Sequence, residues 1–122
     1  MLIALWITAG LLTLVELGAG LNKLLRSRAG LITLGRQFDW ANDVSTPVIK
    51  LTATLEVIGA LGVILPLATG VAPILTPIAA TALAVLMIGP VTLHLRRHES
   101  ALPAIVVGLL AVAVAVLGFL YL

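Results

Sequence analysis

The most constraining feature of the sequence is a set of long stretches without any Asp, Glu, Lys or Arg. They cover residues 1–15, 57–95 and 100–122. A helix needs about 20 mainly apolar residues to cross the hydrocarbon core of a bilayer. Together with their apolar flanks, the stretches therefore provide one, two and one membrane-spanning helices. The predicted spans lie near Leu2–Leu25, Pro47–Leu67, Val71–Leu95 and Ala101–Leu122.

The composition also indicates a lipid environment. Of the 122 residues, 61% are hydrophobic and 10% are charged, whereas soluble domains carry about 25% charged residues. A soluble chain of this size would leave large apolar patches exposed to water. A transmembrane barrel is excluded because its strands alternate between apolar and polar residues, and these segments are apolar on all sides. The prediction is an all-α, antiparallel four-helix membrane bundle formed by one domain, residues 1–122.

Several classes of function are excluded by the residues that the chain lacks. It has no cysteine, which excludes disulfide relay, thiolate nucleophiles and cysteine-ligated centres. It has too few aromatic residues for a basic–aromatic surface, so no nucleic-acid partner is expected. His94 and His98 are spaced as a metal pair, but no third ligand accompanies them and no metal site is expected. The sequence encodes no self-contained catalytic centre and no covalent cofactor site, so any oxidoreductase activity would depend on a partner.

The basic residues predict the orientation of the bundle. All seven lie at or between spans 1 and 2, or between spans 3 and 4: Lys23, Arg26, Arg28, Arg36, Lys50, Arg96 and Arg97. Basic residues accumulate in cytoplasmic loops. Both charged loops are therefore expected to be cytoplasmic, with both termini and the turn at residues 68–70 outside.

The longer cytoplasmic loop, residues 26–46, is expected to form a short interfacial helix or an ordered loop. Trp40 is predicted to lie at the level of the lipid headgroups. Ser45 or Asp43 is a candidate N-cap for span 2, where Pro47 suits the first helical turn. The loop is either a lipid-anchored connector or a lid over a cytoplasm-facing cavity, and the sequence is compatible with both.

Two glutamates lie inside the predicted spans. Glu16 lies nine residues before Leu25 and Glu56 lies nine residues after Pro47, so each is about 13 Å from the cytoplasmic boundary. Inserting an ionised residue at this depth costs about 2.5–3.5 kcal/mol, so neither side chain is expected to face lipid. The two acids either take part in ligand binding or proton transfer, or only join helices by hydrogen bonds.

Helical spacing assigns both glutamates to faces of small and polar residues. The face on span 1 consists of Ala9, Thr13, Glu16, Gly20 and Lys23. The corresponding face on span 2 consists of Thr52, Glu56, Gly59, Val63 and Pro66. Span 4 presents Gly108, Ala111, Ala115 and Gly118. Such faces let membrane helices approach one another closely.

Span 3 contains Pro90, which cannot donate a hydrogen bond to the carbonyl of Leu86 and should kink the helix. The inner face of this span is expected to contain Ala80, Ala84, Met87 and Val91. With that face inward, His94 points into the bundle at its cytoplasmic rim, within reach of Lys23. In the simpler interpretation, Lys23 and Lys50 are only snorkelling anchors.

Three motifs resemble the DoxX-like family of membrane proteins. They are GLNKL at Gly20–Leu24, LEVIGALGVILP at Leu55–Pro66 and HLRRHE at His94–Glu99. The resemblance implies a multi-pass, four-helix protein of the bacterial cell membrane. It also implies an association with membrane redox systems, such as thiosulfate:quinone oxidoreductase, and marks Lys23, Glu56 and His94 as positions of interest.

The leading hypothesis is a DoxX-like subunit or accessory of a membrane redox system. It would bind a quinone or another amphipathic small molecule in the core of the bundle. The candidate ligand-binding residues are Glu16, Glu56, Lys23 and His94. The expected surroundings are the lipid bilayer and other membrane or redox subunits, or further copies of the chain.

Two alternatives belong to other classes of protein. A small proton-coupled multidrug transporter would use Glu16 and Lys23 of span 1. The dual topology of such transporters requires balanced basic residues, whereas all seven lie on one side here. A scaffold or interaction subunit would use the buried glutamates only to fix helix pairing.

Overall fold

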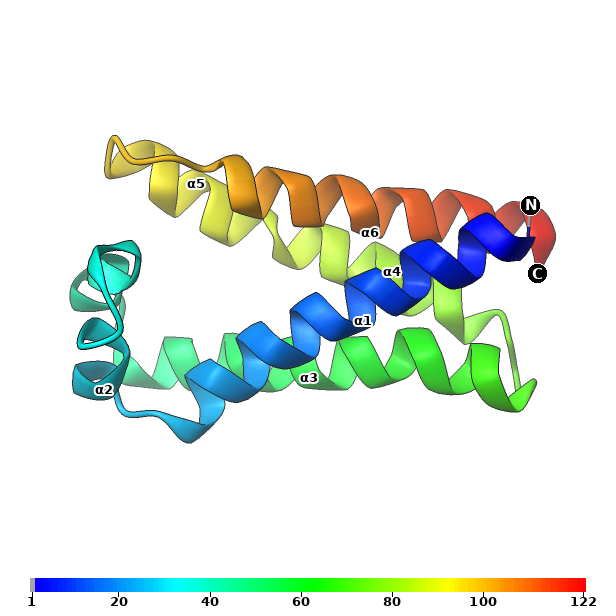
Figure 1. Ribbon diagram of the computed structural model, residues 1–122, viewed down its shortest axis with the longest axis horizontal. Helices are drawn as coiled ribbons and strands as arrows, with labels where there is room; N and C mark the ends of the chain where they lie inside the picture. The colour runs from blue at the N-terminus through cyan, green and yellow to red at the C-terminus, as the bar shows by residue number, and fades with distance from the viewer. Residues whose placement is uncertain (1) are drawn as a thin grey trace.

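The computed structural model describes residues 2–122, which form helices connected by short loops, without strands in that range (Figure 1). The helices in chain order are α1 (Leu2–Leu25), α2 (Arg28–Ile32), the 3-10 helix η1 (Arg36–Asp43), α3 (Thr46–Thr69), α4 (Leu75–Leu86), α5 (Ile88–Arg96) and α6 (Leu102–Tyr121). Four segments are long and apolar enough to cross a membrane: α1, α3, α4 together with α5, and α6. The predicted all-α class with four spans is confirmed.

The four long segments form an antiparallel bundle. Helix α1 packs against α3 and α6, and α4 packs against the same two helices. Both termini lie at one end, while α2, η1 and the α5–α6 connection lie at the other (Figure 1). All the basic residues are therefore at the end opposite the termini.

The bundle exposes large apolar side chains along its length. Leu14 on α1, Ile58 on α3 and Leu109 on α6 are between 60% and 70% exposed. Contiguous apolar surface of this extent is unfavourable in water but is the natural outer face of a membrane bundle. The outward faces of the helices therefore belong in the bilayer.

The helix bounds differ from the predicted spans mainly at the turn between α3 and α4. Helix α3 continues to Thr69 and ends at Gly70, whose left-handed backbone (φ 72°) lets its N–H bond to the carbonyl of Pro66. Ala72 also has a positive φ, and the chain turns before α4 begins at Leu75. The third span therefore starts later than the predicted Val71, because a left-handed residue cannot continue an α-helix.

The predicted inner face of α1 is confirmed, because Ala9, Thr13, Glu16 and Gly20 are all buried. On α3 the prediction is wrong in part. Glu56, Val63 and Pro66 are buried, but Thr52 and Gly59 lie at the edge of the buried face, which instead includes Ile49, Ala53 and Ala60. The reason is that α3 contacts both α1 and α4, so its buried face is turned between them.

Close contact between α1 and α3 depends on a glycine. A Cβ atom at Gly20 would lie 2.9 Å from Cγ2 of Val57 and 3.0 Å from the carbonyl oxygen of Ala53. These distances are shorter than side chains tolerate, so any larger residue would push the two helices apart.

The third span is interrupted at Met87, between α4 and α5. Pro90 lies in the first turn of α5 and has no N–H to bond the carbonyl of Leu86, the last residue of α4. The predicted kink is confirmed. Beyond the break, α5 packs against α4 and α6 and diverges from α1 and α3 (Figure 1).

Candidate ligand-binding cavity

The divergence of α5 from α1 and α3 creates a cavity of about 480 Å³ at the charged end of the bundle. Its walls come from α1, η1, α3, α4 and α5, and most of the lining is apolar. Its polar side chains are Asn22, Lys23, Thr52, Glu56 and His94. Mostly apolar cavities with a few polar groups are typical of sites for small amphipathic molecules.

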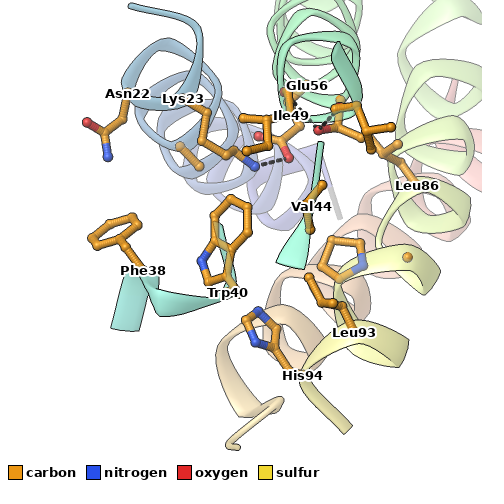
Figure 2. Close-up of a pocket in the computed structure, with 15 residues that line it drawn as sticks. Asn22, Lys23, Phe38, Trp40, Val44, Ile49, Glu56, Leu86, Leu93 and His94 are labelled. Atoms are coloured by element: carbon orange, nitrogen blue, oxygen red, sulfur yellow. Dashed lines mark hydrogen bonds and ion pairs between the residues drawn. The ribbon is translucent and has the colours of Figure 1, made fainter. Parts of the chain in front are cut away.

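An ion pair forms the polar centre of the cavity. The Nζ atom of Lys23 on α1 lies 2.5 Å from Oε1 of Glu56 on α3 (Figure 2). The side chain of Glu56 is 2% exposed and that of Lys23 is 14% exposed. The two helices can bring these groups together because Gly20, one turn before Lys23, allows the close contact described above. A buried pair of this kind needs its partner, since removing either charge leaves the other uncompensated.

The 3-10 helix η1 closes the cavity with two aromatic side chains. Phe38 and Trp40 both line it, and the Trp40 ring lies between Lys23 and His94 in the close-up (Figure 2). Lys23 Nζ is 6.0 Å from the centre of that ring, at the limit of a cation–π contact. The loop therefore has the position of a lid over the cavity. That Trp40 lies at the level of the lipid headgroups stays a prediction.

A network of charged side chains joins η1 to the end of α5. Arg97 forms an ion pair with Asp43, the last residue of η1, and its Nε lies 3.0 Å from Oε1 of Glu99. The same oxygen is 2.6 Å from Nδ1 of His94, a cavity residue. The hydrogen bond with His94, followed by the contacts with Arg97, lowers the pKa of Glu99. The network therefore connects the lid to the cavity wall.

Neither Asp43 nor Ser45 caps the second span through its side chain, contrary to the prediction. Asp43 is paired with Arg97, and Ser45, which occupies the N-cap position of α3, makes no capping bond through its side chain. Pro47 lies in the first turn of α3 as expected and lacks an N–H to be capped.

Lys50 has a structural role that the sequence did not predict. Its Nζ donates hydrogen bonds to the carbonyl oxygens of Lys23 (2.8 Å), Leu24 (3.0 Å) and Arg26. The carbonyls of Lys23 and Leu24 belong to the last turn of α1, and that of Arg26 follows directly after it. No further turn of helix provides N–H groups for these oxygens. Lys50 therefore caps α1 from the neighbouring helix, and its interpretation as a snorkelling anchor is wrong.

The structure brings together three of the four predicted site residues. Lys23, Glu56 and His94 all line the cavity. Glu16 does not line it and lies deeper in the bundle, 2% exposed. Its Oε2 atom has no hydrogen-bond partner among the described residues. Glu16 therefore does not join α1 to another helix through that oxygen.

Sequence reasoning missed part of the cavity wall, including Asn22 and Phe38. Asn22 adjoins Lys23, and the aromatic pair of η1 was a detectable signal, but nothing in the sequence shows how the loop folds over the bundle. Within residues 2–122, no group of three or more His, Asp or Glu side chains is arranged to hold a metal ion.

Comparison with known proteins identifies the family of the chain. The model of the DoxX-like family matches residues 7–116, which include most of each of the four spans and the three motifs GLNKL, LEVIGALGVILP and HLRRHE. No curated protein and no solved structure matches the chain. Because the family model covers most of the sequence, the chain belongs to the DoxX-like family.

Proposed function

We propose that this membrane protein binds an amphipathic small molecule of the quinone class in the cavity beneath η1. The observation that carries the proposal is the Lys23–Glu56 ion pair, which lies at the wall of an otherwise apolar cavity. Groups that orient a ligand are typically few, polar and set in apolar walls. The proposed role is that of a subunit or accessory of a membrane redox system.

The lining residues suit both parts of such a ligand. The Lys23 ammonium is a hydrogen-bond donor for a headgroup carbonyl, and Glu56 is an acceptor for a headgroup hydroxyl. The aromatic rings of Phe38 and Trp40 offer surfaces on which a flat ring stacks. The apolar wall formed by Leu86, Pro90 and Leu93 suits the apolar part of the molecule.

The proposal assigns electron transfer to partner proteins. The chain has no cysteine and therefore no thiol or iron–sulfur centre of its own. Other membrane or redox subunits, or further copies of the chain, would complete the system. The chain itself would supply the site where the ligand is held and hydrogen-bonded.

We also propose that the protein lies in the bacterial inner membrane with both termini outside the cytoplasm. All seven basic residues are at the end of the bundle opposite the termini, and basic residues favour the cytoplasmic side. Fusion of a reporter that is active only in the periplasm to Leu122 should give activity. Activity of a cytoplasmic reporter at the same position would reverse the orientation.

The fluorescence of Trp40 provides a test of ligand binding. The chain has two tryptophans, and Trp6 lies on α1 near the opposite end of the bundle. In a Trp6→Phe background, a short-chain quinone titrated into protein in detergent should quench Trp40 saturably. Glu56→Gln should weaken this quenching, while Asp39→Asn, on the same lid but outside the cavity lining, should leave it unchanged.

Two outcomes would support another class of function. Linear, non-saturating quenching in all variants would contradict a quinone site and favour the scaffold interpretation. Saturable quenching by cationic drugs but not by quinones would favour a transporter. The position of Glu16 outside the cavity does not support the transporter, which would need that acid in contact with its substrate.

A further inference from the structure

Only one of the two buried carboxyl groups in the described bundle forms an ion pair with an ammonium group. Glu16 and Glu56 are each 2% exposed. The Nζ atom of Lys23 forms an ion pair with Oε1 of Glu56. The Nζ atom of Lys50 donates hydrogen bonds to carbonyl oxygens at the end of α1. Glu56 therefore has a counter-ion, whereas no described Lys or Arg forms an ion pair with Glu16.

Glu16 lies close to Glu56 along the contact between α1 and α3. A Cβ atom at Gly20 would lie 3.2 Å from Cβ of Glu56. Glu16 is one helical turn from Gly20 on the same buried face, and Thr13 is about one turn further. The atoms Thr13 Oγ1, Glu16 Oε2 and Glu56 Oε2 are all buried without a protein partner in the described chain. A column of polar oxygen atoms thus continues from the ion pair into the bundle.

The neighbouring helices offer Glu16 no other charge. Helix α1 packs against α3 and α6. The ionisable side chains of α3 are Lys50 and Glu56, and α6 has only Tyr121, at its far end. On α1 itself Lys23 is the only other ionisable side chain, and it is paired with Glu56.

The column of oxygen atoms is blocked by apolar side chains toward the end of the bundle that carries the termini. Toward the charged end it approaches the cavity. Leu5, Ala9 and Leu12 are fully buried and belong to the main apolar core, which lies between Glu16 and the terminal end of α1. In the opposite direction, Glu56 lines the cavity, whereas Glu16 does not. A proton that enters from the aqueous side through the cavity therefore reaches Glu56 before Glu16.

We propose that Glu16 is an intramembrane proton-binding site that is loaded through the cavity by way of Glu56. An ionised carboxylate without a counter-ion is strongly unfavourable in apolar surroundings, whereas a protonated carboxyl is neutral. In the loading step, the O–H bond on Glu56 breaks, an O–H bond forms on Glu16, and the negative charge returns to Glu56. No electrons are transferred. The site needs no ligand in the cavity, and it is therefore independent of the proposed quinone binding.

Infrared spectroscopy of the full chain in lipid vesicles at neutral pH, without added quinone, tests the proton site. A protonated carboxyl gives a C=O stretching band that ionised carboxylates lack. The band should be present in the wild type, disappear in Glu16→Gln, shift in Glu16→Asp and stay unchanged in Asp39→Asn. Absence of the band, or its persistence in Glu16→Gln, would overturn the proposal. A band that appears only when sodium is removed would also overturn it, because a cation would then occupy the site.

The route through Glu56 has a separate test. The double variant Lys23→Met with Glu56→Gln removes the ion pair as a neutral whole, so Glu16 should keep its proton and its band. Exchange of this proton for deuterium from the solvent should be slower than in the wild type, because Glu56 no longer passes it on. An unchanged exchange rate would overturn the route. Loss of quinone quenching in the same variant would concern only the cavity ligand, so the two proposals fail separately.

Discussion

Asp43 and Arg97 form an ion pair between the last residue of η1 and the end of α5. This contact joins the two sides of the cavity, since η1 supplies Phe38 and Trp40 and α5 supplies His94. The C-terminal end of η1 is thus held in two ways: the chain continues from it into α3, and Asp43 is paired with Arg97 at the end of α5. Opening it requires that this pair be broken.

Loss of the Asp43–Arg97 pair should loosen the lid. We expect Asp43→Asn to raise the quenching of Trp40 by acrylamide in the Trp6→Phe background, because a neutral amide binds Arg97 less strongly than a carboxylate does. The control is Asp39→Asn, which removes a carboxylate from the same helix that forms no ion pair in the described structure. Equal quenching in both variants would show that the ion pair does not hold the lid.

The network at the lid should also respond to acid. Its contacts with His94 and Arg97 favour the charged form of Glu99 and lower the pKa of Glu99. The stabilisation is therefore complete above the ordinary pKa of a glutamate and is lost as the pH falls through the lowered value. Quenching of Trp40 by acrylamide should increase only at strongly acidic pH. In Glu99→Gln the quenching should already be raised at neutral pH, and its increase in acid should be smaller, because only the Asp43–Arg97 pair remains to be broken. An unaltered pH profile would argue against the network.

The contact of Gly20 with α3 should make this position intolerant of a methyl group. Gly20→Ala is expected to destabilise the bundle by about 1–3 kcal/mol, the usual range for overpacking a well-packed interior. Gly18 is the matched control, because a Cβ atom there meets nothing within 4 Å. Unfolding of both variants by denaturant in micelles measures the difference. Similar stabilities for the two variants would contradict the close α1–α3 contact.

Lys50 should stabilise the end of α1 through its hydrogen bonds to carbonyl groups. We expect Lys50→Met, which keeps the apolar part of the side chain, to lower the unfolding free energy by about 1–2 kcal/mol. Arg36→Met removes the same charge from an exposed position on η1 and should have little effect. If the two variants lose stability equally, the effect belongs to net charge and not to the cap.

The fold was largely predictable because each step follows from a strong local signal. The charge-free stretches determined the four spans, and Pro90 determined the break in the third span. The inner face of α1 followed from helical spacing, since Ala9 to Gly20 repeat at helical intervals. The rotation of the buried face of α3 was not predictable, because it depends on contact with two neighbouring helices, α1 and α4, at once.

The candidate site was predictable only in part. Lys23, Glu56 and His94 all lie in the cytoplasmic halves of three predicted spans, so topology alone brings them toward the same end of the bundle. The lid was not predictable in the same way. The pairing of Asp43 with Arg97 and the capping of α1 by Lys50 join residues far apart in sequence. Such contacts depend on how the loop folds over the helices, which hydrophobic periodicity does not report.

Photoaffinity labelling with a quinone analogue is the most direct test of the central claim, that the cavity beneath η1 is the ligand site. Labelling is expected in the segment from Phe38 to Val44 and at Leu93 and His94, and it should be suppressed by excess unlabelled quinone and reduced in Glu56→Gln. Labelling spread over lipid-facing residues such as Leu14 and Leu109, without competition, would contradict it.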